Sequence, residues 1–129
     1  MAKFGKRSLS NLETCHPSIQ KVLSEAIKYF DFSVLCGYRN QEDQDKAYSD
    51  GFSKVKFPNG KHNTNPSLAV DIAPYPINWD DISRFHFMAG VILTVANQLN
   101  IELEWGGNWK SFKDYPHFQL KNKKESINV

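Results

Sequence analysis

Residues 68–73, with the sequence LAVDIA, form an apolar run that contains one charged residue, Asp71. The run is short, contains β-branched side chains and ends at Pro74, which predicts a β-strand. Side chains on a strand alternate between the two faces of a sheet, so the large apolar side chains point to one face and Asp71 points to the other, between two alanines. Burial of a carboxylate costs free energy unless a partner compensates its charge. We therefore expect a sheet with one apolar face and one face on which Asp71 meets a partner.

A second segment, near the C-terminus, repeats this arrangement. In residues 115–120, YPHFQL, strand alternation places Phe118 and Leu120 on one face and His117 and Gln119 on the other. Each of the two predicted strands therefore carries a side chain able to bind a metal on its polar face, opposite large apolar side chains.

The other elements follow from apolar spacing and from capping residues. Helical spacing predicts helices at residues 16–30, 41–51 and 80–100. Strands are predicted at residues 32–37, 67–73, 101–105 and 115–120. Residues 52–66, rich in Gly, Pro and Asn, read as a long loop of the kind that is often functional. This order predicts an α+β fold in which helices pack on one face of a small, largely antiparallel sheet.

Composition narrows the class of protein. Residues 1–129 suit one domain with a hydrophobic core, and residues 121–129 are expected to be a flexible basic tail. No apolar run approaches the ~20 residues of a membrane span, and the basic N-terminus lacks the apolar stretch of a signal peptide, so we expect synthesis in the cytosol and no membrane insertion. A net charge of +2 is too weak to indicate a nucleic-acid partner. The two cysteines are expected to be reduced, and neither has a context that predicts a nucleophile.

His62 lies in the long loop that leads into the strand of Asp71. Together with His117, these residues form a set suited to a catalytic zinc ion, which has three protein ligands and keeps one position for water. Such an ion lowers the pKa of a bound water to about 7 and polarises a carbonyl oxygen. The alternative is that His62 is a surface residue and that Asp71 pairs with a lysine or an arginine.

Asp114 precedes His117 by three residues, and Pro116 disfavours a helix between them. A carboxylate so close to a metal ligand can reach a water molecule at the metal, which is the position that a general base needs. The alternative is a turn aspartate that bonds to nearby backbone N–H groups.

Arg39 follows the predicted strand at 32–37, and Gln44 lies one turn into the next helix. A guanidinium at a strand end can stabilise charge that develops on a carbonyl oxygen or can bind a substrate carboxylate. The alternative for Arg39 is a salt bridge to the acidic helix that follows. Gln44 is expected to donate a hydrogen bond to substrate, and its alternative is a surface amide.

Taken in order, four segments resemble the zinc D,D-carboxypeptidase and L-alanyl-D-glutamate endopeptidase family. They are GYRNQEDQDKAY, HNTNPSLAVDIAPYP, EWGGNW and DYPHFQL. This family includes the vancomycin-resistance carboxypeptidases and many phage endolysins, and its fold is shared with the hedgehog signalling domain. The resemblance runs from about Phe4 to Leu120. Two departures are Gly60, where the family often has a serine, and the segment NTNPS, which lengthens the spacing to Asp71 as in phage-type relatives.

For the site, the resemblance implies that His62, Asp71 and His117 bind one zinc ion. It further implies that Asp114 is the catalytic base and that Arg39 contacts the substrate or the oxyanion. We interpret the longer spacing before Asp71 as a feature of the phage-type subgroup and not as loss of the site.

For the activity, the resemblance implies a single-domain, phage-type endolysin that hydrolyses a peptide bond in peptidoglycan. The expected bond is L-Ala–D-Glu, and the enzyme is expected to be a monomer that crosses the membrane through a separate pore-forming protein. Two alternatives are a D-Ala–D-Ala carboxypeptidase of the same family and a zinc-stabilised binding module without catalysis.

Overall fold

A computed structural model describes residues 2–121 of the chain. The expected tail at residues 121–129 therefore lies outside the described residues, apart from Lys121. The described helices and strands are α1 (Lys6–Leu12), α2 (Pro17–Ala26), β1 (Phe32–Cys36), α3 (Gln41–Ser49), the 3-10 turn η1 (Lys61–Asn63), β2 (Ala69–Pro74), α4 (Ile82–Gln98), β3 (Leu103–Trp105), the 3-10 turn η2 (Gly106–Asn108) and β4 (His117–Leu120).

The four described strands form one sheet in the order β1-β2-β4-β3, and every neighbouring pair is antiparallel. Val70 of β2 lies opposite Phe118 of β4, and Trp105 of β3 lies on the other side of Phe118. One position along, Asp71 lies opposite His117. The α+β fold with a small antiparallel sheet is therefore confirmed, and the register separates large apolar side chains from Asp71 and His117.

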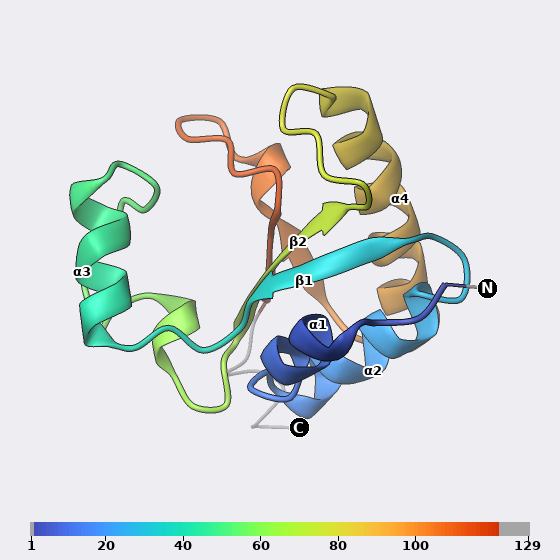
Figure 1. The fold of residues 1–129 in the computed structure, drawn as a ribbon, viewed down its shortest axis with the longest axis horizontal. Helices are drawn as coiled ribbons and strands as arrows, with labels where there is room; N and C mark the ends of the chain where they lie inside the picture. The colour runs from blue at the N-terminus through green and yellow to red at the C-terminus, as the bar shows by residue number, and fades with distance from the viewer. Residues whose placement is uncertain (1, 122–129) are drawn as a thin grey trace.

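Helices α2 and α4 cover the apolar face of the sheet (Figure 1). Ile19 and Leu23 from α2 and Phe85 from α4 are buried in one core with Val70 and Phe118. Helix α3 stands apart from this helical layer at the opposite side of the molecule, as Figure 1 shows. The helices that form the core thus leave the polar face of the sheet to loops and to α3.

Capping side chains begin the three longer helices at the predicted places. The Asn40 side chain accepts a hydrogen bond from the backbone N–H of Asp43, 2.9 Å away, at the start of α3. Asp81 caps α4 in the same way, through the N–H of Arg84. Each cap satisfies a backbone donor that has no partner within its helix.

Helix α1 is the element that the sequence did not predict. It has seven residues, too few for a clear apolar period. The Ser8 hydroxyl accepts a hydrogen bond from the backbone N–H of Val34 in β1 at 3.0 Å, and Leu12 is buried in the core. Contact with β1 therefore stabilises this helix, as is usual for helices too short to be stable alone.

The long loop before β2 is tied to the segment that follows β1 and to the residue that precedes β2. Backbone hydrogen bonds join Arg39 N–H to the His62 carbonyl at 2.8 Å and Leu68 N–H to the Lys61 carbonyl at 2.9 Å. The loop thus carries η1, with His62, to the polar face beside β1 and β2.

Both cysteines are free, as predicted. Among residues 2–121, no helix has the length and apolar character needed to cross a membrane.

Candidate metal centre

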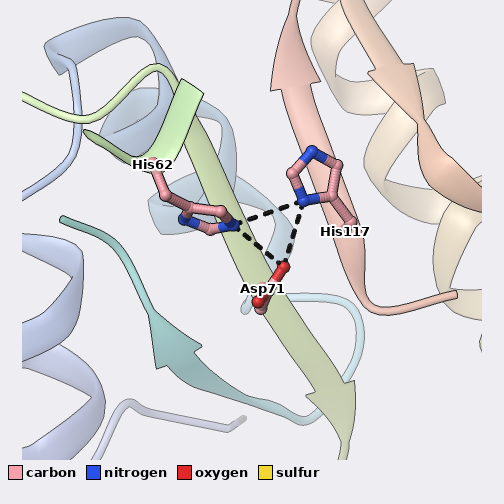
Figure 2. Close-up of side chains that lie close together, drawn as sticks. All are labelled: His62, Asp71 and His117. Carbon is pink, nitrogen blue, oxygen red and sulfur yellow. Dashed lines mark hydrogen bonds and ion pairs between the residues drawn. The ribbon is translucent and has the colours of Figure 1, made fainter. Parts of the chain in front are cut away.

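Three side chains from separate elements converge on the polar face of the sheet, as Figure 2 shows. His62 Nε2, His117 Nδ1 and Asp71 Oδ1 form a triangle in which each pair of atoms is 3.3 Å apart. We call these residues the His62–Asp71–His117 cluster. The structure brings together the three residues that the sequence proposed as a set, and their role as metal ligands stays a prediction.

The ring nitrogens that face the triangle carry lone pairs. His62 Nδ1 lies 2.7 Å from the Gly37 carbonyl oxygen, which can only accept, so Nδ1 holds the proton of a neutral ring. His117 Nε2 lies 2.8 Å from Gln119 Oε1 in the same relation. When both rings are neutral, two imidazole lone pairs and a carboxylate oxygen therefore point at one another, and a metal ion or a proton on one ring would stabilise this arrangement.

The size of the triangle suits zinc. Zinc binds imidazole nitrogen and carboxylate oxygen at about 2.0–2.1 Å, so two ligands of a tetrahedral zinc lie about 3.3–3.4 Å apart. The 3.3 Å separations in the His62–Asp71–His117 cluster match this value. The hydrogen bonds to Gly37 and Gln119 orient the two rings, as carbonyl groups commonly do for metal-binding histidines.

The pKa values of His62 and Asp71 also indicate that positive charge stabilises the cluster. Burial by itself lowers the pKa of His62, but the charge and hydrogen bond of Asp71 outweigh it and raise the pKa to about 10. Burial likewise acts to raise the pKa of Asp71, yet His62 and His117 hold it well below its usual range. A proton on His62 can therefore supply the positive charge that a metal ion would otherwise supply.

Arg39 reaches the cluster through the second oxygen of Asp71. Its Nη2 lies 3.2 Å from Asp71 Oδ2, and the two side chains are only 16% and 17% exposed. Its Nη1 donates to Gln44 Oε1 at 3.0 Å. The alternative that Asp71 pairs with a basic residue is thus true of Oδ2, while Oδ1 faces the histidines. Because Gln44 lies in α3, Arg39 contacts the following helix through a hydrogen bond to an amide. A contact of Arg39 with substrate stays a prediction.

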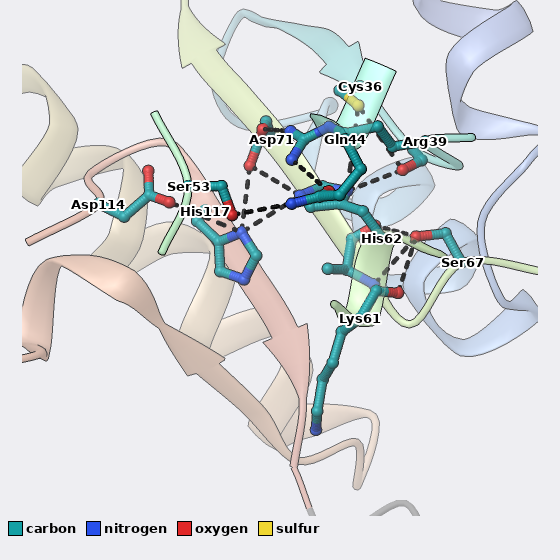
Figure 3. A network of polar contacts seen from close by, with 12 residues as sticks. Cys36, Arg39, Gln44, Ser53, Lys61, His62, Ser67, Asp71, Asp114 and His117 are labelled. Carbon is teal, nitrogen blue, oxygen red and sulfur yellow. Dashed lines mark hydrogen bonds and ion pairs between the residues drawn. The ribbon is translucent and has the colours of Figure 1, made fainter. Parts of the chain in front are cut away.

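Gln44 lies at the centre of a buried network, drawn in Figure 3. It is 1% exposed, so it is neither a surface amide nor an open side chain. Its oxygen accepts from Arg39 and from Asn63 Nδ2, 3.2 Å away. Its nitrogen donates to Ser53 Oγ at 2.9 Å and to the Val55 carbonyl at 2.7 Å. Both N–H groups and both lone pairs are therefore used within the chain, which leaves none for the predicted bond to substrate.

Asp114 lies beside the cluster without joining the triangle. Its Oδ2 is 3.9 Å from His117 Nδ1. Burial and the negative charge of Asp71 raise the pKa of Asp114 to about 6. A carboxyl group with a pKa near neutrality can both accept and return a proton at physiological pH.

The His62–Asp71–His117 cluster opens into a cavity of about 830 Å³ that Asp114 and Arg39 also line. Its walls are largely apolar, and the lining side chains include Trp79, Phe85, Trp109, Phe112 and Tyr115. A volume of this size accommodates a short peptide and lies within the usual range for ligand sites.

Two site residues were missed by sequence reasoning. Gln119 orients His117. Strand alternation placed Gln119 on the same face as His117, so the sequence did contain a signal for this contact. Asn63 donates to the Arg39 carbonyl and to Gln44, and both of these residues are far from Asn63 in the sequence. No local signal distinguishes Asn63 from a loop asparagine exposed to solvent.

Comparisons with known proteins identify the relatives of this chain. The family model described as phage L-alanyl-D-glutamate peptidase matches residues 1–125. The L-alanyl-D-glutamate peptidase of Escherichia phage T5 is 33% identical over 125 residues, covering 92% of this chain and 89% of that protein. The peptidoglycan L-alanyl-D-glutamate endopeptidase CwlK of Bacillus subtilis is 31% identical over 110 residues, which cover 74% of this chain and 64% of CwlK.

The fold is also similar to a solved structure. The crystal structure of the Serratia marcescens L-Ala D-Glu endopeptidase ChiX aligns with a TM-score of 0.81 and 30% sequence identity, covering 95% of this chain and 93% of that one. The family model spans nearly the whole sequence, and relatives of 30% identity or more match this chain over most of its length. The chain therefore belongs to the phage L-alanyl-D-glutamate peptidase family.

Proposed function

We propose that this protein is a zinc peptidase that hydrolyses the L-Ala–D-Glu bond of peptidoglycan, with zinc held by His62, Asp71 and His117. The observation that carries the proposal is the triangle of lone-pair donors, each pair 3.3 Å apart, beside a carboxyl group with a pKa of about 6. Membership of a family of peptidases supports the choice of bond, since the relatives are named for L-alanyl-D-glutamate cleavage.

Zinc at this place would supply Lewis-acid chemistry, which acidifies water and polarises a carbonyl oxygen. The chain's own carboxyl group at Asp114 would accept the proton of the attacking water. It would then return that proton to the amine that leaves, so that one residue serves as base and acid in turn. The position of Asp114, 3.9 Å from a ligand atom of His117, supports this role.

Arg39 and Gln44 are proposed to position the metal ligands. Arg39 holds Asp71 through Oδ2, which leaves Oδ1 for the metal. Gln44 holds Arg39 and, through Asn63, the turn that carries His62. The predicted contact of Arg39 with an oxyanion would use N–H groups beyond these two bonds.

The cellular setting is part of the same proposal. We propose one peptidase domain that acts as a monomeric phage-type endolysin and reaches the wall through a separate pore. Similarity to the phage T5 enzyme over 92% of this chain supports this setting. Light scattering should give the mass of one chain, and expression in a bacterium should cause lysis only after the inner membrane is permeabilised.

The bond itself is tested by mass spectrometry of fragments released from purified peptidoglycan. We expect stem peptides with a new N-terminal D-Glu and glycan strands that retain L-Ala. Release of free D-Ala with intact stems would instead support the D,D-carboxypeptidase alternative. Binding to the wall without released fragments would support the non-catalytic alternative.

A further inference from the structure

The bond named above places a negative charge next to the site of cleavage. Glutamate has two carboxyl groups, and when one of them continues the peptide chain the other stays free, so D-Glu carries a carboxylate on the same residue as the amide nitrogen that is released. An enzyme that selects this bond gains specificity from a cation placed to meet that carboxylate. The choice of the residue that supplies this cation rests on the proposed function.

Four basic side chains line the cavity: Arg39, Lys54, Lys61 and Lys113. Arg39 donates to Asp71 and Gln44, and the function proposed above assigns its remaining N–H groups to the oxyanion. Lys61 Nζ donates to the Leu120 carbonyl at 2.7 Å, and Lys113 Nζ donates to the Trp109 carbonyl at 3.0 Å. Among residues 2–121, no oxygen partner is recorded for Lys54, whose Nζ lies 5.2 Å from the centre of the Phe112 ring.

The backbone around Lys54 is held on both sides by a buried amide. Gln44 Nε2 donates to Ser53 Oγ, as Figure 3 shows. It also donates to the Val55 carbonyl, so the bonded residues are those directly before and after Lys54. The oxygen of the same amide holds Arg39, which in turn holds Asp71. Lys54 is thereby anchored to the frame of the His62–Asp71–His117 cluster, although its own side chain extends from an exposed loop.

We propose that Lys54 binds the free carboxylate of the D-Glu residue whose amide bond is cut. Before substrate enters, the ammonium group rests on the face of Phe112, an attraction that is weak at an exposed site. A substrate carboxylate offers a stronger, charge-assisted hydrogen bond and draws the ammonium from the ring. Phe52 and Val55, which flank Lys54 in the cavity lining, are apolar, and among the lining cations of residues 2–121 Lys54 is the one without an oxygen partner.

The test uses two soluble stem peptides that are identical except at this group. One contains D-Glu with its free carboxylate, and the other contains the carboxamide, D-isoglutamine. The zinc-loaded native protein should cleave the carboxylate peptide with about a tenfold higher kcat/KM, expressed mainly in KM. Lys54→Gln should reduce this ratio to about one, and Lys54→Arg should restore most of it. Higher salt should shrink the ratio in the native protein because exposed charges are screened.

Lys56→Gln is the matched control. Lys56 lies in the same loop with its Nζ also 5.2 Å from a ring centre, that of Tyr48, but neither residue lines the cavity. This variant should keep the native ratio. A ratio that is unchanged in Lys54→Gln, or equally reduced in Lys56→Gln, overturns the proposal.

A binding measurement separates this proposal from the proposed function. Affinities of both peptides for the zinc-loaded protein are measured by chemical-shift titration, whether or not either peptide is cut. Equal or undetectable binding of the two overturns the role of Lys54. A preference for the carboxylate that is lost in Lys54→Gln, with no cleavage of the Ala–Glu bond, supports Lys54 and contradicts the peptidase assignment.

Discussion

The carboxyl group of Asp114 lies 3.9 Å from His117 Nδ1, close enough to act on a water molecule at the proposed metal, yet it is not one of the three clustered donors. We expect Asp114→Asn to keep its zinc content and to lose at least about a hundredfold in hydrolysis of purified peptidoglycan. The base must be ionised, so the native rate should rise with pH along an acid limb. That limb should lie no higher than the pKa of about 6, since a bound cation lowers it further.

Elemental analysis and release of soluble fragments measure the two halves of this prediction. Asp80→Asn, which changes an exposed aspartate outside the cavity lining, is the control and should retain the native rate. A native rate in Asp114→Asn would remove that residue from the mechanism.

His62 links metal binding to proton release. Its pKa of about 10 in the protein alone means that the ring carries a proton at neutral pH. A metal takes only the neutral ring, so zinc binding near neutral pH should release about one proton, and zinc affinity should fall as the pH is lowered. Calorimetry in two buffers of different ionisation enthalpy measures the number of protons. A binding enthalpy that is the same in both buffers would contradict the charge state assigned to His62.

The 3-10 turn η2 allows β4 to approach it closely. A Cβ atom at Gly106 would collide with the Asp114 carbonyl oxygen and crowd the side chains of Asp114 and His117. Gly106→Ala should therefore destabilise the fold by about 1–3 kcal/mol and remove most activity, because it displaces both residues. Urea unfolding and peptidoglycan hydrolysis measure the two effects.

Gly90 in α4 is the matched control for this change. A Cβ atom there meets no other atom within 4 Å. Gly90→Ala should stabilise the helix by up to about 1 kcal/mol and leave activity unchanged. If Gly106→Ala were as active as Gly90→Ala, the contact between η2 and β4 would have no part in placing Asp114.

Helix α3 contributes Gln44 to the network behind the metal site. Gln44→Met removes four hydrogen bonds of a buried amide and should cost about 3 kcal/mol of unfolding free energy. It should also weaken zinc binding about tenfold, because Arg39 and Asn63 lose their shared acceptor. Competition with a chromophoric chelator measures the affinity.

Gln20→Met tests whether lost stability alone explains a change in affinity. Gln20 donates one hydrogen bond, to the Cys15 carbonyl at 2.8 Å, on the helical side of the protein. Gln20→Met should lower the free energy of unfolding by about 1 kcal/mol without a change in zinc affinity. Native zinc affinity in Gln44→Met would limit Gln44 to a purely structural role.

At the scale of the whole molecule, the core and the His62–Asp71–His117 cluster occupy opposite faces of one sheet. The core side chains pack against α2 and α4, whereas Asp71 and His117 face the cavity. Removal of zinc should therefore leave the fold in place. Zinc at a hundredfold excess over its Kd should add about 2.7 kcal/mol, which raises the Tm by several degrees.

Circular dichroism with and without a chelator checks this expectation. The far-ultraviolet spectrum at room temperature should be the same in both conditions, while the Tm should fall on chelation. Loss of the folded spectrum on chelation would show that the sheet depends on the metal, as in small zinc domains.

The sequence by itself determined which side chains share a face. Strand alternation is a local property of the backbone, so it separated Asp71 and His117 from Val70 and Phe118 without knowledge of the partner strands. Caps such as Asn40 are local for the same reason. The identity of the family was also readable, because its motifs are short segments that keep their order along the chain.

Only the tertiary structure decided which of these residues meet. The pairing of β2 with β4 passes over β3 in the sequence, and this register places Asp71 opposite His117. The burial of Gln44 and its bond to Arg39 depend on the path of the loop after α3, and α1 depends on contact with β1. These features arise from contacts between residues far apart in the chain, whose free energies no local pattern contains.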